Sequence, residues 1–214
     1  MIRRIALFAM LIMLTACGTS PEKAMYEHME KAVILEEVFA ANQQPLVDAE
    51  KKEFALFEDI ISLGISEKEE IKALSDEALS IVNLRKSLIE QENESIEAGY
   101  IQFQKVALEI PKLKNKEAKE LVEDVMEAMN RRYDTYQQLK VAYEHSITLD
   151  KKLYEMFQED EVTIAELQAQ IDEINEMYLK VKELKEQFND ETKTFNDLKK
   201  AFYQSTNLNI AYEQ

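Results

Sequence analysis

The 214-residue chain has little of what builds tight turns and cross-links: three glycines, three prolines, one cysteine and no tryptophan. Glycine and proline together make up roughly 12% of an average protein, so their scarcity argues against sheets, α/β units and glycine-rich phosphate loops. The single cysteine, Cys17, cannot form an internal disulfide bond or a multi-cysteine zinc site. The composition that remains is typical of an all-α protein.

Positive charge is also scarce, because 26 basic side chains face 42 acidic ones and leave a net charge of −16. Proteins that bind nucleic acid draw their affinity from lysine and arginine on phosphates, so we expect no nucleic-acid partner. The length fits one domain, compact or elongated.

The N-terminus has the pattern of an export signal. Arg3 and Arg4 are the only charged residues before Glu22, and residues 5–14 are all apolar. A basic start followed by such a run is typical of a secretory signal peptide. Ten helical residues span about 15 Å, half of a ~30 Å hydrocarbon core, so the run is too short for a transmembrane helix.

The end of this segment, Leu14-Thr15-Ala16-Cys17, resembles the lipobox of bacterial lipoproteins. That resemblance implies a diacylglycerol on the thiol of Cys17, cleavage between Ala16 and Cys17, and often a further acyl chain such as palmitate on the new amino terminus. Two or more acyl chains anchor a protein stably without a transmembrane helix. We therefore expect a lipid anchor on the extracytoplasmic face of the cell membrane. The alternatives are an ordinary secretory signal that happens to contain a cysteine and a buried N-terminal helix.

These signals predict three parts of the chain. Residues 1–16 form a lipoprotein signal peptide that is removed, residues 17–20 a lipidated tether, and residues 21–214 a single elongated helical domain. Ser20-Pro21-Glu22 is a typical helix start, with a serine cap and proline in the first turn. We expect an interruption at residues 42–45 and a second stop near Gly64, although these two segments could equally be one bent helix.

Three longer amphipathic segments follow. A capping box at Ser66 predicts the start of the first, with Gly99 as a candidate kink and Pro111 near its end. Asn115 begins the next, which should turn at residues 158–162, and a capping box at Thr163 begins the last. Apolar residues recur every seven positions in all three: Val82, Ile89, Ile96, Phe103 and Ile110; Val122, Met129, Tyr136 and Tyr143; Leu167, Ile174, Val181, Phe188, Phe195 and Phe202. The pattern predicts an elongated antiparallel helical bundle, a coiled-coil-like rod of three long helices plus shorter N-terminal helices.

No motif for catalysis or for a cofactor is present. The two histidines, His28 and His145, lack the glutamate three residues earlier that a di-iron carboxylate bundle requires, so we expect them at solvated helix positions. The acidic runs lack the twelve-residue pattern of a calcium loop. We therefore expect no enzyme activity, metal, cofactor or small-molecule substrate, and we expect most tyrosines and phenylalanines to fill the core.

A lipobox followed by about 200 acidic, helical residues resembles the cell-wall-binding lipoprotein family of Gram-positive bacteria, the YkyA-like lipoproteins. The resemblance implies contact with peptidoglycan. In so acidic a chain that contact needs stacking on glycans, divalent bridges or lysine patches such as Lys112, Lys114 and Lys116, because anionic wall polymers repel it. Two hypotheses follow: a non-enzymatic envelope scaffold or interaction protein, and a peptidoglycan-binding module. A solute-binding lipoprotein or a lipoprotein enzyme is disfavoured because such folds need sheets and tryptophan-rich clefts.

Overall fold

The structure, a computed structural model, describes residues 19–63, 67–206 and 208, and every regular element in these ranges is helical. The elements are α1 (Pro21–Leu35), α2 (Glu37–Ser62), α3 (Lys68–Phe103), the 3₁₀ turns η1 (Gln104–Leu108) and η2 (Ile110–Lys112), α4 (Lys116–Met156) and α5 (Ile164–Ser205). The predicted all-α, elongated antiparallel bundle is confirmed.

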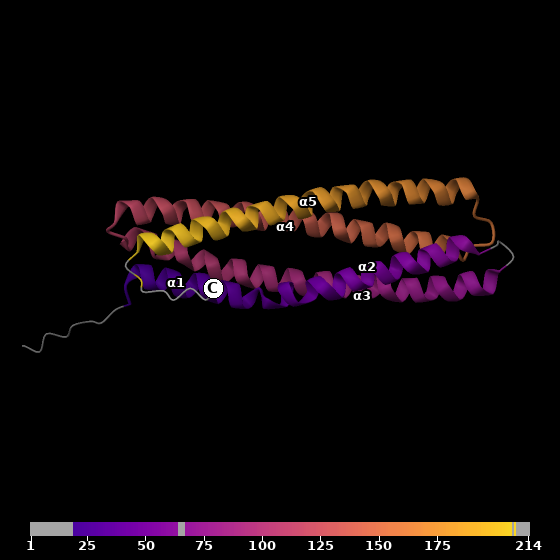
Figure 1. Ribbon diagram of the computed structural model, residues 1–214, viewed down its shortest axis with the longest axis horizontal. Helices are drawn as coiled ribbons and strands as arrows, with labels where there is room; N and C mark the ends of the chain where they lie inside the picture. Colours follow the sequence, from indigo (N-terminus) through magenta and orange to yellow (C-terminus); the bar gives the residue numbers. More distant parts are fainter. Residues whose placement is uncertain (1–18, 64–66, 207, 209–214) are drawn as a thin grey trace, which may run out of the picture.

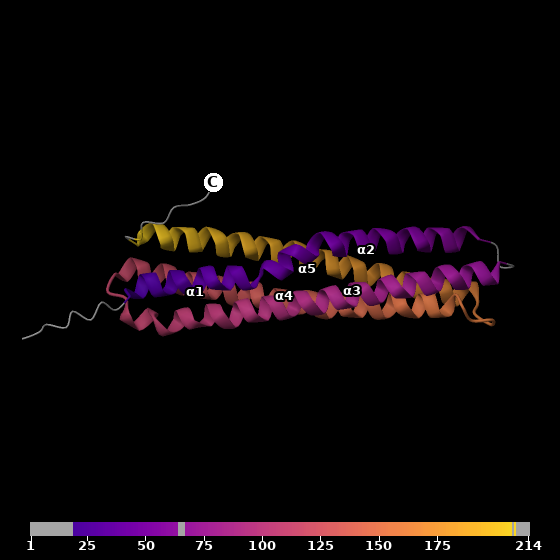
Figure 2. The same ribbon diagram turned by 90° about the horizontal axis from the view of Figure 1, so that it is seen from below.

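The rod consists of two helical hairpins laid side by side (Figure 1). In the first, α1 and α2 follow each other end to end and pack on α3; in the second, α4 packs along α5, and α3 joins the hairpins by packing on α4. Figure 2 shows α1 continuing into α2 along the rod. The start of α1, the start of α4 and the end of α5 lie at one end of the rod. With 41 residues, α4 is about 62 Å long.

Three predicted helix starts are confirmed by their caps. The Ser20 side chain accepts the backbone N–H of Lys23 at 3.3 Å, and the Asn115 side chain accepts the N–H of Glu117 at 3.0 Å. Thr163 and Glu166 form the reciprocal capping box that was expected, just after the turn between α4 and α5. Two further predictions, a capping box at Ser66 and a helix stop near Gly64, involve residues outside the described ranges, although α2 does end at Ser62.

The interruption predicted at residues 42–45 is wrong, because the first helix breaks at Glu36 and Pro45 lies inside α2. Ser95 of α3 stabilises the break: its hydroxyl donates to the Leu35 carbonyl at 2.7 Å and accepts the Phe39 N–H at 3.2 Å. The backbone groups freed by the break are thus bonded to a neighbouring helix. Pro45 is exposed, so the carbonyl that its ring leaves unbonded is on the solvent side.

The α3 helix continues through Gly99 without a break. At Gly99 the helix packs closely against the junction between α1 and α2. A Cβ atom at this position would lie 2.7 Å from Glu36 Cγ and 3.1 Å from the Ala32 carbonyl oxygen. Glu36 cannot move aside freely, because both of its carboxylate oxygens bind the Arg132 guanidinium, at 2.9 and 2.6 Å. Only glycine lets the α1–α2 junction approach α3 this closely.

Gly99→Ala is therefore expected to lower the free energy of unfolding by about 1–3 kcal/mol, although alanine favours a helix by roughly 1 kcal/mol. Urea unfolding followed by circular dichroism measures the change. Glu94→Ala, at an exposed position on the same helix, is the control and should stay within about 0.5 kcal/mol of the parent. A neutral or stabilising Gly99→Ala would contradict the close-contact account.

The seven-residue rows form the core as predicted. Buried members include Val82, Ile89, Ile96 and Phe103; Val122, Met129, Tyr136 and Tyr143; Ile174, Val181, Phe188, Phe195 and Phe202. The first row differs at its end, because the α-helix stops at Phe103 instead of near Pro111, which lies inside η2. Val106 is fully buried in η1, since 3₁₀ geometry repeats every three residues and returns it to the side of Phe103.

Candidate functional site

A buried polar network joins all four long helices in the half of the rod formed by α2. At its centre, Arg85 of α3 has no exposed side-chain surface. Its Nη1 donates to Glu53 Oε2 of α2 at 2.6 Å and to Asp150 Oδ2 of α4 at 2.8 Å, and its Nε donates to the hydroxyl of Tyr143 at 3.2 Å. Tyr178 of α5 donates to Asp150 Oδ2 at 2.7 Å. The network therefore holds the two hairpins in register.

Three carboxyl groups in or near this network hold protons more tightly than usual. Burial raises the pKa of Glu53 to about 7, with Arg85 only partly offsetting the effect, and burial likewise raises the pKa of Asp150. Further along α3, burial raises the pKa of Glu92 to about 7, against the opposing influence of Lys185 and of the hydrogen bond from Gln43. These are the groups whose charge is costly in the folded protein.

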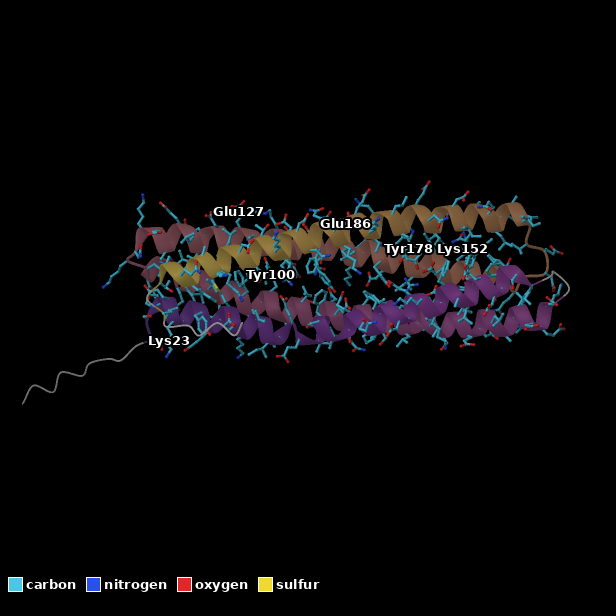
Figure 3. The ribbon with its side chains drawn as sticks, viewed as in Figure 1. Lys23, Tyr100, Glu127, Lys152, Tyr178 and Glu186 are labelled. Carbon is cyan, nitrogen blue, oxygen red and sulfur yellow. The ribbon has the colours of Figure 1, made fainter. Side chains whose placement is uncertain are left out.

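A cavity of about 450 Å³ opens beside the network between α2 and α5. Its lining is mostly apolar and aromatic and also holds charged groups of both signs. The lining includes Phe54, Phe57, Tyr154, Ile171 and Tyr178, the carboxylates Glu50, Glu53 and Asp150, and the lysines Lys182 and Lys185. Tyr178 is labelled in Figure 3. A smaller hollow of about 70 Å³ adjoins it, shares Glu50, Val181 and Lys185 with it, and is also lined by Glu92 and Tyr136. Together they form the α2/α5 groove.

The raised pKa of Glu92 should make the free energy of unfolding fall as the pH rises. Between pH 4.5 and about 7 the folded chain holds the Glu92 proton more tightly than the unfolded chain, so this group lowers stability as the pH rises through that range. Glu92→Gln keeps an acceptor for Gln43 but removes the charge. We expect the variant to be more stable than the parent by about 1–3 kcal/mol at pH 8 and nearly equal at pH 5.

Urea unfolding of both proteins at the two pH values tests this expectation. The exposed Glu94→Gln on the same helix is the matched control and should track the parent at both. Parallel pH profiles for the parent and Glu92→Gln would show that Glu92 is not the group responsible.

The residues singled out from sequence lie in other places. The lipobox Leu14, Thr15, Ala16 and Cys17, with the attachment residue and the cleavage position, is outside the described residues. His28 is half-buried on α1, with its Nδ1 2.9 Å from Gln102 Nε2, and His145 is exposed on α4. Within the described ranges, no group of three or more histidine, cysteine, aspartate or glutamate side chains is arranged to hold a metal ion.

Sequence reasoning missed the network and the groove. Arg85 and Asp150 lie in charge-rich stretches where solvated side chains are the rule, and nothing local marks them as buried. One signal was available: Arg85 and Asp150 occupy positions three residues after Val82 and seven after Tyr143, in register with the apolar rows. A charged residue on a core face indicates a buried partner.

The described residues define the class of protein as an elongated all-helical rod. None of the described helices has a stretch long and apolar enough to cross a membrane. The chain belongs to the family described as "Putative cell-wall binding lipoprotein", whose sequence model matches residues 20–205. The family expected from the sequence is thereby confirmed, and with it membership of the lipoproteins of the cell envelope.

Two known proteins resemble the chain over most of its length. It is 29% identical over 206 residues to "Uncharacterized lipoprotein YkyA" of Bacillus subtilis (strain 168), covering 96% of this chain and 92% of that protein. A crystal structure of a conserved protein of unknown function from Staphylococcus aureus superposes with a TM-score of 0.68 at 14% identity, covering 86% of this chain and 96% of that one. The second likeness shows the fold alone.

Proposed function

We propose that the protein is a non-enzymatic, lipid-anchored rod on the extracytoplasmic face of the membrane that serves as a scaffold or interaction partner of other envelope proteins. One observation carries this proposal: α1 begins at Pro21, four residues after Cys17, and its start lies at one end of the rod. A lipid on Cys17 would therefore hold the rod by its tip. Residues 1–16 would be the signal peptide, 17–20 the tether and 21–214 the projecting domain.

Such an anchor sets the reach of the protein. A rod held by its tip and standing upright would carry the turn between α4 and α5 to about 60 Å from the membrane surface. That turn contains Glu159, Asp160 and Glu161, so the far tip is acidic. The groove between α2 and α5 belongs to the half away from the anchor. Surfaces in that half of the rod would be too far from the membrane to contact lipid, so they would be free to contact other proteins.

Binding to the cell wall is the second candidate, favoured by the description of the family to which the chain belongs. The lysines considered as wall contacts do not support it, because Lys112, Lys114 and Lys116 are exposed at the anchored end of the rod. The net charge of −16 opposes approach to anionic wall polymers within a Debye length of ~8 Å. Wall binding would have to rest on uncharged glycan contacts.

A sedimentation experiment with purified peptidoglycan separates the two candidates. The chain from Gly18 onward contains the whole described fold and is mixed with peptidoglycan freed of teichoic acid, at 0.15 M and 1 M NaCl. If the scaffold proposal holds, the protein stays in the supernatant at both salt concentrations. Sedimentation that survives 1 M salt supports wall binding and contradicts the scaffold as the main function. Crosslinking of the anchored protein in cells then identifies its partners.

A further inference from the structure

The two ends of the rod differ in charge. At the end where α1 begins, residues 20–24, 104–120 and 202–206 include the connection from α3 to α4 and hold six lysines and four glutamates. The sequence after the described residues adds one acidic side chain, Glu213. At the opposite end, residues 59–71 and 153–167 hold nine acidic side chains and one lysine. The rod therefore has a basic end and a strongly acidic end.

The positive charge of the basic end is concentrated in the connection from α3 to α4. Four exposed lysines lie there within eight residues: Lys112, Lys114, Lys116 and Lys119. Lys112 pairs with Glu109 at 2.8 Å, and Lys116, whose side chain is 90% exposed, pairs with Glu120 at 3.4 Å. Surface ion pairs of this kind contribute little energy, so these lysines remain available to a stronger anionic partner.

An exposed apolar side chain lies in the same connection. Leu108, at the end of η1, is 69% exposed, and Pro111 in η2 is exposed beside Lys112. Apolar side chains next to lysines are typical of protein surfaces that enter the headgroup region of a bilayer, where the apolar group is buried and the lysines meet anionic lipids. The connection thus combines the two features that such a surface needs.

The basic end lies next to the segment that would carry the lipid. Ser20, Asn115 and Ser205 line one hollow of about 240 Å³, so the starts of α1 and α4 adjoin each other. Ser20 is three residues after Cys17, a distance of at most about 11 Å in extended chain. Exposed charges attract each other over a Debye length of ~8 Å at physiological salt. A lipid on Cys17 would therefore bring these lysines close to the headgroups.

We propose that the basic end binds anionic phospholipid headgroups and that this contact holds the rod upright on the membrane. The proposal rests on the proposed lipid anchor at Cys17. Lysines in residues 112–119 contact the headgroup phosphates, and Leu108 enters the interface. Each lysine close to an anionic bilayer raises the affinity about fivefold. A rod lying on its side would bring its acidic flanks to the same phosphates, because the chain has 42 acidic side chains and only 26 basic ones.

Vesicle binding of the chain from Gly18 onward tests this surface without any lipid on the protein, so a negative result leaves the anchor at Cys17 untouched. The protein is sedimented with sucrose-loaded vesicles of phosphatidylcholine, with or without about 30 mol% phosphatidylglycerol. At 0.05 M NaCl the partition coefficient should be about tenfold or more higher on the anionic vesicles, and at 0.5 M NaCl the difference should disappear. Equal binding to both vesicles at low salt, or no binding to the anionic ones, overturns the proposal.

Two triple variants with the same net charge locate the contact. Lys112→Gln, Lys114→Gln and Lys116→Gln change the basic end, whereas Lys51→Gln, Lys151→Gln and Lys152→Gln change exposed lysines in the other half of the rod, where Figure 3 labels Lys152. All six positions are exposed, so both variants should fold, which circular dichroism checks. The first variant should bind anionic vesicles about tenfold or more weakly than the parent and the second less than about threefold. Equal losses would show an effect of net charge alone and contradict the proposed surface.

The apolar contact and the source of the phosphate are tested in the same assay. Leu108→Ser should weaken binding to anionic vesicles about threefold, whereas Ile164→Ser, at an exposed apolar position of the acidic end, should not change it. Soluble poly(glycerol phosphate), added at the phosphate concentration of the phosphatidylglycerol, should leave most of the protein on the vesicles. Release of most of the protein would show that the basic end prefers a wall polymer to a membrane and would overturn the proposal.

Neutron reflectometry on a supported bilayer containing phosphatidylglycerol measures the orientation of the rod. The chain from Cys17 onward is coupled through its only thiol to a maleimide lipid, so the result does not depend on lipid attachment in cells. The parent should form a protein layer about 60 Å thick, the length of an upright rod. The triple variant at residues 112, 114 and 116 should form a thinner layer. A thin layer for the parent, or equal thickness for both proteins, would contradict the orienting role.

Discussion

Replacing Arg85 with methionine is expected to lower the free energy of unfolding by about 3–5 kcal/mol at pH 8. Methionine can fill the space of the side chain, but it leaves Glu53 and Asp150 buried together without a countercharge. At pH 5 the loss should be smaller, because burial has already raised the pKa of both carboxyl groups and protonation removes their repulsion. Urea unfolding at the two pH values measures both effects.

The chain offers a matched control for this substitution. Arg131 also pairs with two carboxylates, Glu127 and Glu191, but its side chain is 44% exposed, so Arg131→Met should change stability by less than about 1 kcal/mol. Adding Glu53→Gln and Asp150→Asn to Arg85→Met should recover much of the loss by removing the unpaired charges. If the triple variant is no more stable than Arg85→Met, the loss comes from packing instead of charge.

If Cys17 is the proposed lipid attachment site, replacing it with serine is expected to abolish both lipid attachment and cleavage, because a hydroxyl cannot take the place of the thiol that would carry the diacylglycerol. In cells fed an alkyne-tagged fatty acid, the parent should carry the tag and migrate as the mature chain. The variant should carry none and migrate as a precursor longer by the 16 residues of the predicted signal peptide. Gel mobility, tag fluorescence and mass spectrometry of the N-terminus measure the three outcomes.

A conservative change beside the cleavage position controls for general damage to the signal. Thr19→Ser, two residues after Cys17, should be cleaved and tagged as the parent is. A Cys17→Ser protein that is still cleaved after Ala16 and retained on the membrane would show that the segment is an ordinary secretory signal, and the proposed tip anchor would then be lost.

The helices were predictable because their signals are local. The caps at Ser20, Asn115 and Thr163 follow from side chains within three residues of the groups they bind, and the seven-residue rows follow from the helix period. The break at Glu36 was not predictable in this way. It depends on Ser95 and Gly99, which lie about sixty residues further along the chain and whose effect appears only when α3 packs on the junction.

The groove was hidden for the same kind of reason. Whether Glu53 is solvated or buried depends on where Arg85 and Asp150 stand, on two other helices. A single sequence shows on which face of its helix a residue lies. It does not show whether another helix covers that face. The spacing between α2 and α5, which leaves Phe54 uncovered, is a property of the assembled bundle.

The break at Glu36 also shapes how the molecule would respond to tension. A protein held through its N-terminus and pulled at its far tip takes the force along α1, so the contacts of α1 with α3 are sheared together instead of peeled apart one by one. The pair formed by Glu36 and Arg132 stands at the end of that helix and resists the sliding. If it yields and α1 is pulled free, the 15 residues of α1 lengthen from about 22 to about 50 Å. Met25, Met29 and Ala32 then leave the core that they share with Phe103 and Phe202. The junction at Glu36 would thus set how much chain is released first under tension.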